Sequence, residues 1–193
     1  MKFVSSFTDF LIGKDIISED KKEIYEYGFN QLIVYIYNFA SFIIIGLIMG
    51  MFWQSIAFTV FYMLIRPYAG GYHARTPKMC YIYSLFMIFA VLLWMKVVPL
   101  NGLFYVIIYI ISSLIILKLS PVEDENKPLD NIEKIVFRKR AINAYIILSI
   151  LYFVLWFAGL MELAVCIVLA LFVLSIMLIL GYFKNRYLKR EAI

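Results

Sequence analysis

Residues 161–182 read MELAVCIVLALFVLSIMLILGY, an apolar run in which Glu162 is the single charged residue. A helix needs about 20 apolar residues to cross the hydrocarbon core of a bilayer, with a working range of roughly 17–25. The run therefore predicts a membrane-spanning helix, and it decides the class of fold.

Five further apolar segments accompany this run along the 193-residue chain. They lie at 28–49, 51–65, 80–96, 100–118 and 141–158. The chain is 64% hydrophobic and 16% charged, whereas a soluble domain is about half apolar and about a quarter charged. Lipid must therefore be the solvent for most of the surface. We expect an all-α integral membrane protein with six transmembrane helices, of which the short second and third are tilted, partly re-entrant or packed against protein.

The Lys and Arg residues predict the orientation of these helices. With the N-terminus inside, every Lys and Arg except Lys96 falls in a cytoplasmic part of the chain, as the positive-inside rule requires. We therefore expect a multi-pass protein of the cell membrane with both termini in the cytoplasm.

The N-terminal region carries apolar residues near helical spacing between positions 3 and 17. This pattern favours either an amphipathic helix on the inner leaflet or a cap packed on the bundle. We accordingly divide the chain into an N-terminal cytoplasmic amphipathic part, 1–26, and a polytopic membrane domain, 27–193.

The stretch that carries chemistry is the cytoplasmic loop 66–80, which reads RPYAGGYHARTPKMC and contains the single histidine, His73. Thr76 suits a helix N-cap and Pro77 the first helical turn. Cys80 then falls in the first turn of the third span, where the positive end of the helix favours a thiolate. The amides of Lys78 and Met79 are candidate oxyanion donors at the same end.

His73 is a candidate base for Cys80, because an adjacent base activates cysteine nucleophiles. On one straight helix the two residues would stand about 10.5 Å apart along the axis, too far for a hydrogen bond. The pair therefore requires the loop to fold back, which Gly70 and Gly71 permit through their backbone freedom. The alternative is a surface histidine near an unreactive cysteine. One histidine and one nearby cysteine fall short of a zinc ligand set, and we expect no metal or cofactor.

Three other residues have both a structural and a functional interpretation. Arg66 suits an inner-boundary anchor, a ligand for a substrate carboxylate, or a holder of the loop. Asn30 is a candidate to orient His73, although helix capping is equally natural. Cys166 is expected to be an inert, buried small hydrophobe.

The third cytoplasmic region begins with a Pro-bounded loop at 119–129 and continues as a short, basic-ended helix at 130–140. The cluster Arg138, Lys139 and Arg140 is typical of topology and anionic-lipid contact. An acidic peptide partner would use the same charges.

The sequence resembles the accessory gene regulator B (AgrB) family of bacterial membrane peptidases. The specific likeness runs from Arg66 to Cys80, with Arg-x6-His-x6-Cys spacing and an Ala-Gly-Gly-Tyr-His-Ala core. The stretches 27–28 and 126–129 also look like family motifs, and the family commonly has Glu or Gln where this chain has Asn30.

The resemblance implies a cysteine endopeptidase that cleaves an AgrD-like quorum-sensing propeptide, with Cys80 as nucleophile and His73 as general base. The peptide would remain on Cys80 as a thioester until its own cysteine or serine displaced it as a cyclic thiolactone or lactone. Arg66, Asn30 and Gly71 would support the site. Basic residues of the third cytoplasmic region would face the acidic peptide, namely Lys127, Arg138, Lys139 and Arg140.

The partners expected are therefore the propeptide, the lipid bilayer and, from the resemblance, a second copy of the chain, with no nucleic acid. A non-enzymatic membrane peptide transporter or scaffold is the alternative. Transport of ions or protons is disfavoured because the spans hold almost no ionisable residues, and Lys96 and Glu162 lie near their outer ends.

Overall fold

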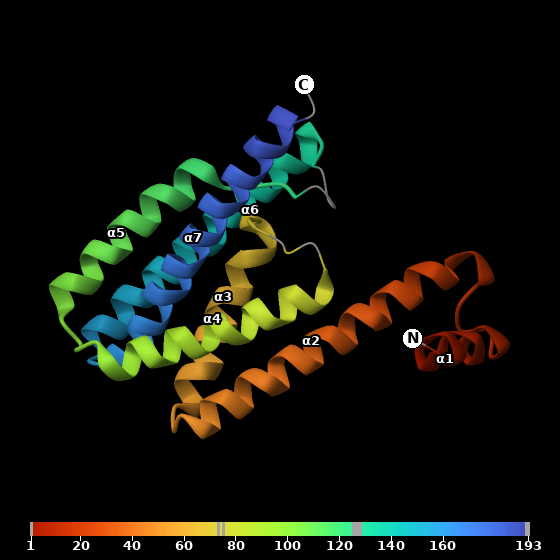
Figure 1. Ribbon diagram of the computed structural model, residues 1–193, viewed down its shortest axis with the longest axis horizontal. Helices are drawn as coiled ribbons and strands as arrows, with labels where there is room; N and C mark the ends of the chain where they lie inside the picture. Colours follow the sequence, from red (N-terminus) through yellow and green to blue (C-terminus); the bar gives the residue numbers. More distant parts are fainter. Residues whose placement is uncertain (1, 73, 75, 125–128, 192–193) are drawn as a thin grey trace. The chain divides into compact units, whose positions relative to one another are not determined.

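The computed structural model describes residues 2–72, 74, 76–124 and 129–191, and helices make up most of these residues (Figure 1). The chain separates into two compact units, Met1–Ser41 and Phe42–Ile193, whose boundary falls inside a helix. The functional division expected between residues 26 and 27 stays a prediction.

The first unit holds α1 (Lys2–Gly13), a short 3-10 turn (Glu19–Lys21) and the start of α2 (Lys22–Ile48). Helix α1 packs on the start of α2, because the Phe7 and Phe29 rings meet edge to face with centroids 5.2 Å apart. An ion pair between Lys22 and Asp9 supports this contact. Helix α1 covers most of the 3–17 pattern, and its place on a lipid surface stays a prediction.

The second unit is built around α7 (Met161–Glu191). The other helices are α3 (Phe52–Ala69), α4 (Pro77–Val97), α5 (Gly102–Leu119) and α6 (Asn131–Phe157). Helix α7 packs against α3, α5 and α6 (Figure 1). In its most apolar window 67% of the residues are buried, against 22% or less in α4, α5 and α6, so α7 is the centre of the unit.

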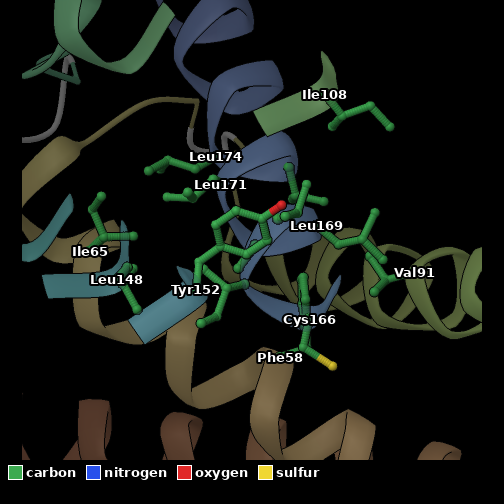
Figure 2. Packing of buried hydrophobic residues seen from close by; sticks show 14 of the residues in the cluster. Phe58, Ile65, Val91, Ile108, Leu148, Tyr152, Cys166, Leu169, Leu171 and Leu174 are labelled. Atoms are coloured by element: carbon green, nitrogen blue, oxygen red, sulfur yellow. The ribbon is translucent and has the colours of Figure 1, made fainter. Parts of the chain in front are cut away.

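The hydrophobic core joins α7 to its neighbours, and Figure 2 shows the Tyr152 ring among the buried leucines of α6 and α7. Cys166 is fully buried in this cluster. Its sulfur lies 3.7 Å from the Gln54 carbonyl oxygen and 3.8 Å from the Met95 sulfur. This placement agrees with the predicted buried thiol.

Five helices among the described residues are long and apolar enough to cross a membrane, which is the make-up of a multi-pass membrane protein. They cover Glu19–Ile48, Lys78–Val97, Gly102–Leu119, Asn131–Phe157 and Met161–Leu188. The expected second segment, 51–65, corresponds to α3, which is not one of these five. The count of six spans and their orientation therefore stay predictions.

Helix α6 differs from the sequence expectation. The prediction of a separate, basic-ended helix at 130–140 was wrong, because Asn131–Phe157 forms one continuous helix. No Gly or Pro interrupts these residues. The helix begins with a capping box, in which the Asp130 carboxylate accepts the Glu133 N–H at 2.6 Å and the Glu133 carboxylate accepts the Asp130 N–H at 3.2 Å.

The central position of α7 predicts that two Leu→Ala substitutions lower the stability of the unit by different amounts. Leu171→Ala removes a fully buried side chain, whereas Leu114 is 64% exposed. We expect Leu171→Ala to lower the free energy of unfolding by about 2 kcal/mol, because the side chains around the new cavity lose packing contacts. This value is at the lower end of the range for truncation of a buried leucine. Leu114→Ala should be nearly neutral. Thermal unfolding in nanodiscs measures both variants, and equal shifts would contradict the central role of α7.

Candidate functional site

Cys80 lies in the first turn of α4, as the sequence predicts. Thr76 is the N-cap, its hydroxyl oxygen accepts the Met79 N–H at 3.3 Å, and Pro77 follows in the first turn. The Cys80 N–H donates to the Thr76 carbonyl at 3.0 Å, and the free thiol is half-buried. The Met79 amide is engaged by the cap, so the prediction that it serves as an oxyanion donor does not fit this geometry.

The loop before α4 leaves α3 by a sharp turn at two glycines. Gly70 and Gly71 have φ of 72° and 116°, values that side chains disfavour and glycine tolerates. The Gly71 N–H donates to the Val122 carbonyl at 3.1 Å, and the Val122 N–H donates to the Ala69 carbonyl at 3.0 Å. A Cβ on Gly70 would overlap the Val122 carbonyl oxygen. The loop therefore uses the backbone freedom of both glycines, and Gly70 also permits the close approach of residue 122.

Helix α7 holds the same loop from another side. The Tyr72 N–H donates to the Met177 carbonyl of α7 at 2.8 Å. Gly181, one turn further on, allows this approach, because its Cβ would lie 2.7 Å from the Tyr72 nitrogen and 2.8 Å from the Gly71 carbonyl carbon. Real Cβ contacts are not that short, so only glycine fits here without a shift. We call these contacts of Gly70, Gly71 and Tyr72 with Val122, Met177 and Gly181 the loop clasp.

Arg66 completes the loop clasp from inside the turn. One guanidinium nitrogen donates to the Gly70 carbonyl, and another donates to the Tyr72 carbonyl at 2.6 Å. Among the three roles considered for Arg66, this geometry favours the holder of the loop.

The segment that pairs with the glycine turn is itself fixed to α7. Lys184 forms an ion pair with Asp124 at 3.2 Å, with side-chain exposures of 16% and 9%. The Asn185 side-chain amide donates to the Glu123 carbonyl at 2.7 Å. These bonds tie residues 122–124 to the C-terminal half of α7, so the loop clasp has two supports on one helix.

For three of the predicted site residues, the structure describes no position relative to the loop clasp. His73 and Lys127 lie outside the described residues, although Tyr72 and Ala74 on either side of His73 are described. Asn30 belongs to the first unit and lies inside α2, which begins at Lys22, so it does not cap a helix. Its predicted role in orienting His73 stays a prediction.

The three basic residues at 138–140 of α6 have different environments. Arg138 donates to the Ser120 carbonyl at 2.7 Å and to the Leu117 carbonyl at 3.1 Å, so it stabilises the end of α5. The Arg140 guanidinium stands 5.8 Å from the centre of the Tyr68 ring, within cation–π range. Lys139 is exposed. Contact of these residues with a peptide stays a prediction.

Sequence reasoning missed the contribution of α7 to the site. Met177 acts through its backbone carbonyl, and every residue type has that group, so the sequence could not reveal this contact. Gly181 did carry a signal, because it interrupts an apolar run, where glycine often marks close packing.

Comparison with known proteins finds one matching family model and two relatives of low sequence identity. The family model described as Accessory gene regulator B matches residues 4–179. An AgrB-like protein of Clostridium perfringens (strain SM101 / Type A) is 24% identical over 166 residues, covering 76% of each chain. A second AgrB-like protein, from Clostridium perfringens (strain 13 / Type A), is 23% identical over the same length and coverage. No solved structure matches significantly.

The loop clasp predicts that Gly181→Ala slows the chemistry of Cys80 without unfolding the protein. The added methyl group would displace the backbone of Gly71 and Tyr72, the residue before the candidate base His73 in the sequence. We expect alkylation of Cys80 by iodoacetamide at neutral pH to slow several-fold in a Cys166→Ala background. Gly13→Ala is the matched control, because a Cβ there meets nothing within 4 Å.

A double-mutant cycle separates positioning from general damage. If Gly181 acts by placing His73, Gly181→Ala should add no further loss to His73→Ala. Fully additive losses would contradict this role.

Proposed function

Because the chain belongs to the accessory gene regulator B family, we propose that it is a membrane cysteine endopeptidase that cleaves an AgrD-like quorum-sensing propeptide. Family membership supports a part in processing agr peptides. The observation that carries the finer proposal is the placement of Cys80 in the first turn of α4, directly after a loop that Arg66 and α7 hold by its backbone.

In the first step of the proposed mechanism, His73 takes the thiol proton of Cys80. The sulfur then bonds to a peptide carbonyl carbon, and the carbon–nitrogen bond breaks. His73 returns the proton to the leaving amine. The helix N-terminus favours the thiolate before attack. The products are a thioester on Cys80 and a free C-terminal tail.

In the second step, a cysteine or serine within the bound peptide attacks the thioester carbonyl. The Cys80 sulfur leaves and takes up the proton that the attacking thiol or hydroxyl loses, with His73 carrying it, and the peptide departs as a thiolactone or lactone. Water is the competing nucleophile. A half-buried thiol at the boundary of an apolar bundle limits that competition by excluding water.

The remaining parts of the proposal concern the surroundings of the site. Both termini and the loop clasp would face the cytoplasm, because almost all Lys and Arg residues would then be inside. An acidic tail of the propeptide would contact Lys127, Lys139 and Arg140, and Arg138 would shape the surface beside them. The family resemblance also favours a homodimer.

Two cysteine substitutions test the nucleophile. Cys80→Ala should abolish propeptide cleavage in reconstituted vesicles, because no other described thiol lies in the loop region. Cys166→Ala is the matched control and should keep nearly normal cleavage, since its thiol is buried in the core. Cleavage is measured by mass spectrometry, with a synthetic AgrD-like propeptide as substrate and thermal unfolding as the check on folding.

Normal cleavage by Cys80→Ala would overturn the assignment of the nucleophile. If the wild-type protein binds the propeptide but never cleaves it, the transporter or scaffold function replaces the endopeptidase.

A further inference from the structure

An apolar groove of about 580 Å³ runs between α4 and α7 and begins at the loop clasp. Its lining comes from one face of each helix and from Tyr72. Met177 belongs to both structures, because its side chain lines the groove while its carbonyl accepts the Tyr72 N–H. The groove is therefore continuous with the loop that carries His73.

Aromatic pairs stand at the two ends of the groove. Tyr72 and Tyr83 have ring centroids 6.5 Å apart at the end near the loop clasp. Trp94 and Phe172 have centroids 6.3 Å apart at the other end. From Tyr83 to Trp94 the helix rises about 16 Å, so the groove has room for several side chains.

Cys80 lies next to the near end. It precedes Tyr83 by three residues, a spacing at which helical side chains are neighbours, and the rise between them is about 4.5 Å. Met87, seven residues after Cys80, also lines the groove. A group bonded to the Cys80 sulfur is thus attached one turn from the opening of the groove.

We propose that this groove binds the apolar side chains of the peptide residues immediately N-terminal to the cleaved bond, while their acyl carbon is bonded to Cys80. This inference rests on the proposed function. The side chains enter, and the peptide backbone stays at the mouth, because an apolar wall gives backbone groups no hydrogen-bond partners and burial there would be costly.

The mouth of the groove adjoins a second cavity, whose lining is apolar at Phe183 and Leu188 and carries polar groups at Lys184 and Tyr187. This smaller cavity of about 350 Å³ shares Tyr72 with the groove. The groove begins one helical turn from Cys80 and adjoins a cavity with polar groups in its lining, and these two features favour a peptide over a lipid acyl chain, which needs neither.

The test uses two synthetic acetyl-tetrapeptide thioesters of equal length, one ending in Leu-Phe and the other in Ser-Ser at the acyl carbon. Each acylates Cys80 when its sulfur bonds to the acyl carbon and the probe thiol leaves. Intact-protein mass spectrometry in nanodiscs, in a Cys166→Ala background, gives the two rates. We expect at least a tenfold preference for the Leu-Phe probe.

Ala90→Trp fills the groove at an exposed position of its lining, and Leu93→Trp is the control on the same helix outside the lining. We expect Ala90→Trp to reduce the preference several-fold and Leu93→Trp to leave it unchanged. Alkylation by iodoacetamide should be unaffected in both. If Ala90→Trp fails to fold, Ile176→Trp fills the groove from α7.

An unchanged preference in the filled variants, or no preference in the wild-type protein, would overturn the proposal. Loss of bound phospholipid in Ala90→Trp without a change in preference would assign the groove to lipid. Failure of the proposed endopeptidase is distinguishable, because the propeptide would then stay uncleaved while the probes still showed the preference.

Discussion

The hydrogen bond from the Tyr72 N–H to the Met177 carbonyl joins the loop between α3 and α4 to the central helix of the bundle. A non-helical segment has no intrahelical partners for its backbone N–H and C=O groups, so those that are buried must be paired elsewhere. Here α7, residue 122 and the Arg66 guanidinium supply the partners. The position of residues 70–72 therefore depends on α7, which is also the most buried of the candidate membrane-spanning helices in the unit.

This dependence explains why the supports of the site are spread along the sequence. The Gly70–Gly71 turn needs residue 122 beside it, and residues 123–124 are in turn bonded to Lys184 and Asn185 of α7. A loop held by backbone bonds tolerates changes in its partners' side chains more easily than loss of glycine. The same arrangement leaves one face of α7 beside α4, where the apolar groove begins at the loop.

The sequence predicted the helical segments well, because the thickness of a bilayer sets the length of an apolar helix. The Thr76 cap, and with it the position of Cys80, followed from local chemistry alone. The start of α6 was predicted within one residue of the Asp130 N-cap, but its continuity was missed because the basic cluster at 138–140 was interpreted as the end of a separate helix. Contacts through the Met177 carbonyl have no sequence signature, so the role of α7 required the structure.

The central claim is that Cys80 forms an acyl-enzyme with a propeptide, and trapping tests it most directly. The protein in nanodiscs is mixed with the propeptide, quenched in acid and examined by mass spectrometry. The account predicts a hydroxylamine-sensitive peptide adduct on Cys80 that forms slowly in His73→Ala. Cleaved propeptide with no adduct on Cys80 at any time, or an adduct on Cys166 instead, would contradict it.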